Sequence, residues 1–241
     1  MAQFANFQNV LPDPNNAIGT AGQVAGDAGP GFASVQLTSN QPIIKDFTNS
    51  GRLLARAVAA HKWTINIKYN PMIRADFENI YTFILGKRGG LTPFYVSLPQ
   101  HRVPQDISFA NWTDTVNLDA TSTLAAGATK ALLGKGGYSN TTNKTPLPGD
   151  LFTIDGSNSN HTKTYMVTRV ENSSDYQSGQ PQPTSSQVRI HFVPGLQKAV
   201  AAADDFVFHN PLIKVIAKDV QQYSLNTDNL YQFSLSLEEV Q

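Results

Sequence analysis

The 241-residue sequence contains no cysteine. Disulfides, thiolate-bound metals and cysteine nucleophiles are therefore excluded, and the composition fits synthesis in a reducing compartment. Charged residues make up only 15% of the chain, with 18 Lys and Arg against 18 Asp and Glu, whereas an average soluble domain has about 25%. Because nucleic-acid binding needs clustered positive charge, no specific nucleic acid is expected as a partner.

Long apolar runs are also missing. The sequence has no stretch of about 18 apolar residues, so we expect no membrane span. Residues 1–10 have no basic start followed by an apolar segment, and we expect no secretory signal. Asn, Gln, Ser and Thr supply the polarity that charge does not. A surface of this kind is poorly protected against self-association, which suits a chain that is covered by neighbouring subunits.

Catalytic and metal-binding patterns are absent as well. The sequence has neither a G-x-S-x-G elbow nor an H-E-x-x-H pair. No two of the five histidines share the spacing of metal ligands; they are His61, His101, His161, His191 and His209. His161 and His191 could meet in space, but two histidines without a carboxylate pattern are a weak signal. We expect no catalytic residue, no cofactor and no metal site.

Two further segments could be interpreted as ligand sites, for a cation and for a phosphate group, but each also has a simpler structural interpretation. Asp150 and Asp155 flank a short strand and could hold a cation, but aspartates in turns commonly satisfy backbone N–H groups, and we favour that interpretation. Residues 134–137 read Gly-Lys-Gly-Gly and superficially resemble a phosphate loop. They lack the upstream glycine and the Ser or Thr of that motif, so we expect a plain loop.

Strict alternation marks two strands that lie far apart in the sequence. Trp63, Ile65, Ile67 and Tyr69 occupy one face of the first, and Tyr231, Phe233, Leu235 and Leu237 occupy one face of the second. Period-two alternation is typical of a sheet with one buried face. Because the two segments match in pattern and length, we expect them to share one sheet or sandwich.

One segment carries a helical pattern. Asn70 and Pro71 predict its start, as N-cap and first helical residue. Five apolar residues then recur on one stripe; they are Ile73, Phe77, Ile80, Tyr81 and Ile84. Lys87 and Arg88 suit the C-terminal end, and the glycines at 89 and 90 stop the helix.

The remaining segments predict a mainly β protein: a β-sandwich or barrel with one flanking helix and an inserted small β-barrel of OB-like type. We expect further strands around 35–37, 94–98, 151–154, 164–170, 188–192 and 212–217. Residues 51–62 could form a short helix or a strand, and we favour a strand or hairpin. Residues 1–31 are predicted to be a flexible N-terminal arm. Residues 11–31 of this arm could be a plain tail or could lie along a neighbouring subunit as part of the interface. The main domain comprises 32–103 and 206–241, and the inserted domain comprises 104–205, since loop insertions cost little entropy.

Aromatic residues suggest where a partner could bind. Six of them could be proposed as a stacking platform for bases or sugars, namely Trp63, Tyr69, Phe77, Tyr81, Phe94 and Tyr95. Four lie on the apolar stripes, so core packing explains them better. Tyr95 is opposite in phase to Phe94, and Trp112 sits among polar residues, so these two are the candidate interface residues. Trp112 could equally attach the inserted domain.

The stretch from Trp63 to Pro99 resembles bacteriophage tail-tip structural proteins of the distal tail or baseplate hub family. The pattern consists of an amphipathic strand, a proline, a helix of the form R-x-x-F-x-x-I-x-x-F, an Arg-Gly pair and an F-x-V-x-L-P strand. The matching positions are Pro71, Arg74, Phe77, Ile80, Phe83, Arg88, Gly89, Phe94, Val96, Leu98 and Pro99. Residues 148–208 resemble the small β domain inserted in such proteins, and YQFSLSLEEV resembles the closing strand.

The resemblance implies a structural component of the virion tail, assembled in the host cytoplasm. It implies a ring of copies, commonly six in such proteins, that joins the tail tube to the hub, fibre or receptor-binding proteins. Two alternatives remain open: a tube-initiator or tail-terminator ring, and a carbohydrate-binding module for the host surface. A cell-wall hydrolase is disfavoured by the missing catalytic patterns.

Overall fold

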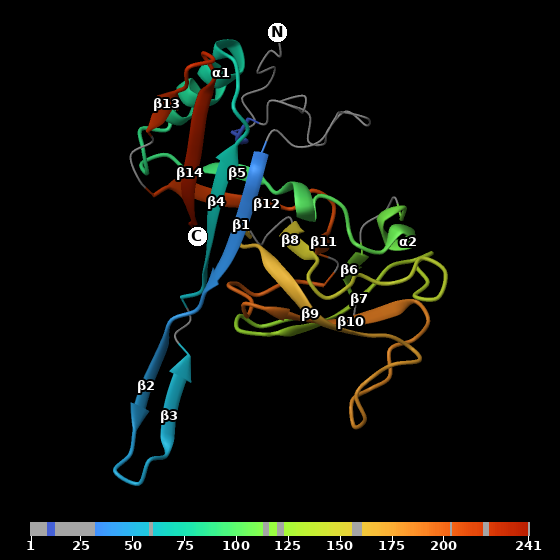
Figure 1. Ribbon diagram of the computed structural model, residues 1–241. Helices are drawn as coiled ribbons and strands as arrows, with labels where there is room; N and C mark the ends of the chain where they lie inside the picture. The colour runs from blue at the N-terminus through green and yellow to red at the C-terminus, as the bar shows by residue number, and fades with distance from the viewer. Residues whose placement is uncertain are drawn as a thin grey trace. The chain divides into compact units, whose positions relative to one another are not determined.

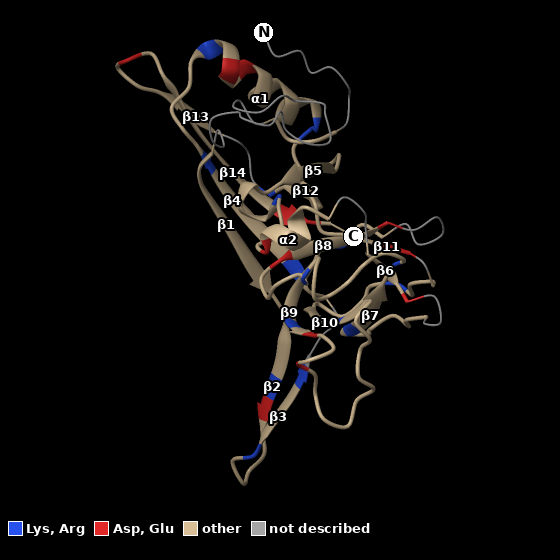
Figure 2. Cartoon of the chain, turned by 90° about the vertical axis from the view of Figure 1, so that its right-hand side faces the viewer, with Lys and Arg blue, Asp and Glu red and all other residues tan. Residues whose placement is uncertain are grey.

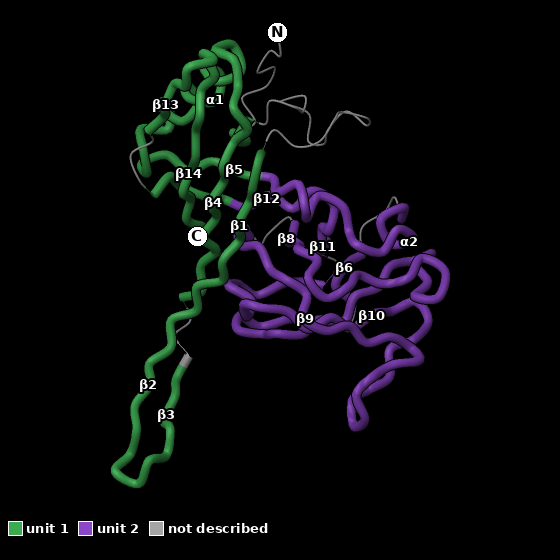
Figure 3. The backbone as a smooth tube through the Cα atoms, in the orientation of Figure 1, with its two compact units in different colours: residues 1–96, 214–241 green, residues 97–213 purple. Residues whose placement is uncertain are grey.

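The computed structural model describes residues 9–12, 32–57, 60–112, 116–119, 123–155, 161–202, 204–218 and 222–240. The fold is mainly β, as the sequence predicts. The chain divides into two compact units (Figure 3): unit 1 comprises residues 1–96 and 214–241, and unit 2 comprises residues 97–213. The chain thus leaves unit 1, completes unit 2 and returns.

Unit 1 is built on a six-stranded sheet with the order β1-β4-β14-β12-β5, in which β13 also pairs with β14 (Figure 1). The strands are β1 (Phe32–Asn40), β4 (Lys62–Tyr69), β5 (Phe94–Ser97), β12 (Leu212–Ala217), β13 (Tyr223–Leu225) and β14 (Tyr231–Glu239). β14 runs antiparallel to β4, with Leu235 opposite Ile67 and Leu237 opposite Ile65. The predicted pairing of these two distant segments is confirmed.

The alternation along β4 gives unit 1 its core. Trp63, Ile65, Ile67 and Tyr69 are buried, whereas Lys62, Asn66 and Lys68 between them are exposed. Phe233, Leu235 and Leu237 of β14 are buried in the same way. The core is therefore one apolar face of the sheet, and each large side chain buried there contributes roughly 1.5–3 kcal/mol.

Helix α1 (Arg74–Gly86) packs on this unit through Phe77, Ile80 and Ile84. The predicted start at Asn70 and Pro71 is wrong: the helix begins at Arg74 after the N-cap Ile73. The reason is that the backbone of Met72 exchanges two hydrogen bonds with Tyr231 of β14, at 3.0 and 2.8 Å. The predicted end is confirmed, since Lys87 is the C-cap and Gly89 adopts a left-handed φ of 65°.

A two-stranded hairpin continues β1 and β4 beyond the sheet (Figure 1). It consists of β2 (Ile43–Phe47) and β3 (Leu53–Ala57), paired antiparallel with Phe47 opposite Leu53. The hairpin predicted for residues 51–62 is thereby confirmed in type, with a first strand that the sequence did not indicate.

Unit 2 is a closed barrel with the strand order β10-β7-β6-β11-β8-β9. The strands are β6 (Val116–Leu118), β7 (Lys130–Gly134), β8 (Leu151–Asp155), β9 (Tyr165–Glu171), β10 (Gln187–Val193) and β11 (Asp205–Val207). Two short helices, η1 (Pro99–His101) and α2 (Ile107–Ala110), precede β6. Phe152 is fully buried at its centre and contacts the rings of Tyr165, Phe192, Phe206 and Phe208. The predicted small barrel is confirmed.

One strand belongs to the barrel although its sequence position suggested otherwise. Residues 206–208 were assigned to the main domain because apolar residues resume there. Instead, Phe206 lies opposite Ile154 of β8 and Val116 of β6. The apolar pattern identifies a strand but cannot tell which sheet it joins.

Candidate assembly interface

The edge of the sheet at β5 is covered by the chain's own N-terminal segment. The backbone N–H of Tyr95 donates to the carbonyl of Asn9, and the N–H of Leu11 donates to the carbonyl of Tyr95, each at 2.7 Å. The hydroxyl of Tyr69 donates to the carbonyl of Pro12 at 3.2 Å. Leu11 and Pro12, which the sequence assigned to a flexible arm, are buried in unit 1. Residues 13–31 of the predicted arm lie outside the described residues.

The opposite edge, β1, has no such cover among the described residues. β1 pairs only with β4, and most of its side chains are exposed. Natural edge strands are usually short, charged or broken by proline, because an open edge can pair with another chain. β1 is nine residues long and contains neither a charged residue nor a proline. Within the described part of the chain, β1 is therefore an open edge without these protections.

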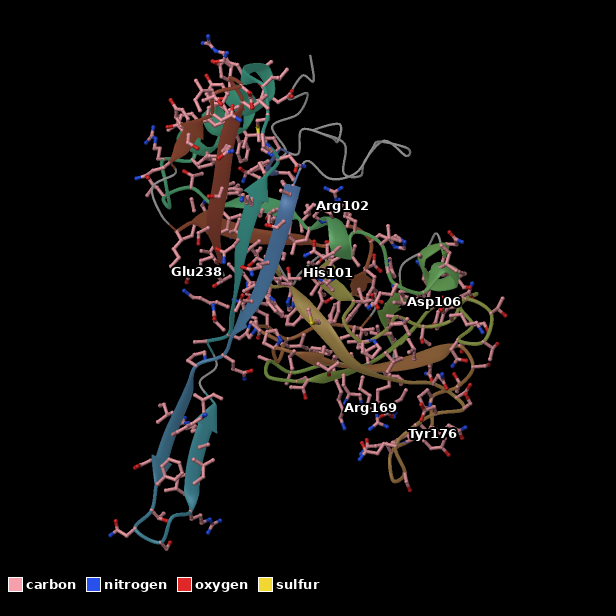
Figure 4. The ribbon with its side chains drawn as sticks, in the orientation of Figure 1. His101, Arg102, Asp106, Arg169, Tyr176 and Glu238 are labelled. Atoms are coloured by element: carbon pink, nitrogen blue, oxygen red, sulfur yellow. The ribbon has the colours of Figure 1, made fainter. Side chains whose placement is uncertain are left out.

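The β2–β3 hairpin exposes large apolar side chains on both of its faces. Phe47 is 67% exposed and lies opposite Leu53, with Ile43 on the same face. Ile44, 62% exposed, and Leu54 lie on the other face. Figure 4 shows side chains projecting to both sides of the hairpin. Since contiguous exposed apolar residues mark interaction sites, and an isolated hairpin is marginally stable in water, this element is built to be covered.

The two predicted interface residues are less exposed than expected. Tyr95 is half-buried, and its backbone is occupied by residues 9–11. The indole of Trp112 packs against the barrel core, with its ring 6.1 Å from that of Tyr138. Trp112 thus contacts the core of the barrel to which it belongs. An interface role for either residue, and a role of Trp112 in attaching the inserted domain, stay predictions.

Four of the six residues of the possible aromatic stacking platform are buried in the core of unit 1. Trp63, Tyr69, Phe77 and Phe94 are each no more than 3% exposed. Their faces are taken by neighbouring rings, such as Phe32 against Tyr69 at 5.1 Å. Core packing, the interpretation favoured from the sequence, is confirmed for these four residues.

The histidines and aspartates do not converge on a reactive centre in the described part of the chain. No three His, Asp or Glu side chains gather there as a possible metal site. His161 hydrogen-bonds to the carbonyl of Ala199, whereas His191 hydrogen-bonds to Glu171. The two histidines therefore have different hydrogen-bond partners. The described helices include none with the length and apolarity needed to cross a bilayer.

Asp150 has the structural role that turn chemistry predicts. Its Oδ2 accepts from the N–H of Leu147 at 2.8 Å, and its Oδ1 accepts from the N–H of Gln105 at 3.1 Å. Residues 134–137 line an open depression of about 420 Å³ together with Asp119 and Gln187. The carboxylate of Asp119 accepts from the Gln187 side chain at 2.7 Å, and it lines the depression together with Lys135.

The most concentrated buried charge lies on the barrel. The carboxylate of Glu171 is fully buried and accepts from Arg189 and His191, both at 2.9 Å, and Arg169 of β9 (labelled in Figure 4) approaches to 3.7 Å. Burial raises the pKa of Glu171, but the hydrogen bonds from His191 and Arg189 outweigh it, and the net pKa lies below the ordinary value. We interpret this network as structural, because every member is paired.

The sequence did not indicate two features of this interface. Residues 9–12, which pair with the edge strand β5, show no alternation of apolar and polar residues, because a segment of four residues is too short to reveal one. The exposed apolar residues of the hairpin resemble core residues in the sequence. Their signal is the pair Ile43-Ile44 followed by Leu53-Leu54, in which both faces of each strand are apolar.

Comparison with known proteins agrees with this architecture. The model of the family described as "Distal tail protein pb9, A domain, N-terminal" matches residues 11–101, which include β1 to β5 and helix α1. Over 216 residues the chain is 27% identical to distal tail protein pb9 of Escherichia phage T5, covering 88% of this chain and 93% of that protein. Both matches support a bacteriophage distal tail protein, which is a structural component of the virion tail.

Proposed function

We propose that copies of this chain form a closed ring that connects the tail tube to the hub and receptor-binding parts of the tail. The ring is a mechanical joint, and no chemical reaction is assigned to it. The observation that carries the proposal is the asymmetry of the unit 1 sheet. One edge is covered by residues 9–12, whereas β1 and the hairpin that continues it are open in the described chain.

Ring closure gives such an open edge a permanent partner. A surface that binds a different surface on the next copy produces a heterologous contact, which closes into a ring when the rotation between copies is a fraction of a full turn. Neutral net charge and an amide-rich surface reduce the repulsion between copies. Six is the copy number that the resemblance to tail-tip proteins implies.

Unit 2 has a different role in the proposal. Its barrel has its own buried core, and the segment 172–186 between β9 and β10 carries the exposed Tyr176 (labelled in Figure 4). Loops on a rigid barrel commonly carry binding function. We assign the barrel to contacts with the other tail proteins. Four aromatic residues of the stacking platform considered for sugars, Trp63, Tyr69, Phe77 and Phe94, are buried and give a sugar-binding role no support.

Electron microscopy tests the proposal at two levels. Negative-stain images of the purified chain should show closed rings of one size. Antibody raised against the chain should label intact virions at the end of the tail that meets the host, whereas a tail-terminator role predicts a label at the end that joins the capsid. Purified chains that never form rings, or a label confined to the end of the tail that joins the capsid, would contradict it.

A further inference from the structure

We propose that the β2–β3 hairpin of one copy docks on the α1–β13 end of unit 1 of the next copy, so that the copies join head to tail. This inference rests on the proposed ring and adds the contact that builds it. The hairpin surface comprises residues 43–57. The acceptor surface comprises Ile73, Asp76, Glu78, Tyr223, Leu225 and Asp228.

The two surfaces lie at opposite ends of the same unit. The hairpin follows the end of the β1–β4 ladder at which Asn40 lies opposite Lys62. Helix α1 follows the other end of β4, where Met72 bridges to Tyr231, the residue that pairs with Leu225 of β13. β4 spans residues 62–69, and at about 3.3 Å per residue the ends are roughly 23 Å apart. Figure 1 shows both features on unit 1. A chain cannot satisfy both surfaces by itself.

Each surface is apolar at its centre. The hairpin presents Phe47 and Leu53 on one face and Ile44 and Leu54 on the other. At the acceptor, Ile73 is 57% exposed and Leu225 is 52% exposed. Tyr223 is also exposed, and its ring rests 4.9 Å from that of Phe77. The acceptor is therefore backed by a rigid aromatic layer, which is the setting in which an inserted apolar side chain binds well.

The charges around the two apolar centres are opposite in sign. The hairpin carries three cations, Lys45, Arg52 and Arg56, and one carboxylate, Asp46. The acceptor end carries three carboxylates, Asp76, Glu78 and Asp228, and one cation, Arg74. Figure 2 shows acidic segments beside a basic one at the start of α1, and basic segments with an acidic one on the hairpin. Such complementarity favours hairpin on acceptor and disfavours hairpin on hairpin.

The unpaired strand edges add main-chain hydrogen bonds to the contact. β13 is a three-residue strand whose described pairing is with β14 alone, and both strands of the hairpin pair only with each other. An open strand edge binds another strand through its backbone. The occupant that meets all three conditions, apolar centre, opposite charge and free edge, is the hairpin of a second copy.

Two assembly-deficient variants test the contact. The hairpin variant is Phe47→Asp with Leu54→Asp, and the acceptor variant is Ile73→Lys with Leu225→Lys. Every substituted side chain is exposed in the single chain, so circular dichroism and the thermal unfolding midpoint should stay near those of the unaltered protein. Loss of two interface anchors should weaken self-association by roughly 100-fold or more. Ile107→Asp, an exposed apolar site on unit 2, is the matched control and should assemble normally.

Mixing the two variants separates head-to-tail contact from any symmetric one. In sedimentation velocity each variant alone should remain a monomer. The mixture should form a one-to-one dimer and nothing larger, because only one intact hairpin and one intact acceptor remain. Variants that assemble like the unaltered protein would overturn the proposed contact while leaving the ring intact.

Covalent cross-linking traps the contact even where it is weak. Because the native chain has no cysteine, introduced cysteines are the only thiols that can react. Phe47→Cys combined with Leu225→Cys should give a ladder of covalent oligomers with a short bismaleimide, ending at the ring size. Either single cysteine variant should stay monomeric. Dimers from Phe47→Cys alone would indicate a symmetric contact, and no ladder from the double variant at any protein concentration would refute the head-to-tail one.

Discussion

Glu171 is the residue on which the ion pairs of the barrel converge. Its buried carboxylate holds Arg189 and His191 at 2.9 Å, and the side chain of Arg189 is only 9% exposed. A paired buried charge contributes little net stability, but removal of one partner leaves the other buried and uncompensated. The network therefore fixes the pairing of β9 with β10 rather than driving the barrel to fold.

Glu171→Gln should therefore destabilise the barrel by about 3 kcal/mol. The amide keeps the shape of the carboxyl group but cannot neutralise Arg189. Urea unfolding followed by circular dichroism measures the change, with the exposed Asp175→Asn as the control. A loss no greater than that of the control would show that the network does not hold the barrel.

The same residue sets a dependence on pH. The pKa of Glu171 is lowered from its ordinary value of 4.5 in the folded state. A carboxyl group whose pKa is lower in the folded than in the unfolded protein stabilises the fold fully at any pH above its unfolded pKa. This contribution to stability is lost as the pH falls through the pKa of the folded state. The contribution of Glu171 to the stability of the barrel should thus be steady from pH 7 to about pH 5 and fall below about pH 4. Glu171→Gln should flatten this fall, and an equally steep fall in the variant would assign it to other carboxylates.

At the scale of elements, α1 is held by its apolar stripe rather than by its surface ion pair. Ile80 is 1% exposed, whereas the Arg74–Glu78 pair, at 2.5 Å, lies in solvent. Ile80→Ala should cost about 2–5 kcal/mol in the unfolding of unit 1, since it leaves a cavity. Glu78→Ala should change it little. Equal effects of the two substitutions in urea unfolding would contradict this assignment.

Periodicity predicts the elements that bury one face and fails for those that do not. The strands at 62–69 and 231–239 alternate cleanly, and their pairing could be inferred from the sequence. The start of α1 was placed too early because the backbone of Met72 pairs with Tyr231, a long-range contact that local capping rules cannot include. β2 was missed because Ile43 and Ile44 occupy opposite faces, so the strand shows no alternation.

At the scale of the whole molecule, we propose that residues 97–213 are the inserted domain, with wider bounds than the sequence indicated. The sequence placed the bounds at 104 and 205, because apolar strands resume near 206. Contacts place β11, at 205–207, in the barrel, and the compact unit extends from 97 to 213. β5 and β12, where the chain leaves and re-enters unit 1, are neighbours in the sheet, so the insertion closes on itself.

Residues 97–213 expressed alone should fold. We expect a cooperative thermal transition and a dispersed amide NMR spectrum, because the barrel has its own aromatic core. Unit 1 should fold when a short Gly-Ser turn joins residues 96 and 214, since adjacent strands lie about 5 Å apart. A molten spectrum for either part would show that the units depend on each other.

The mass of the native chain in solution, followed by light scattering as the protein concentration rises, is the most direct test of the account. The single chain has a mass of 26.2 kDa. The account predicts a transition to one larger species whose mass is a whole multiple of that value, with no further growth because the ring is closed. A mass that stays at 26.2 kDa at every concentration, or that grows without limit, would contradict it.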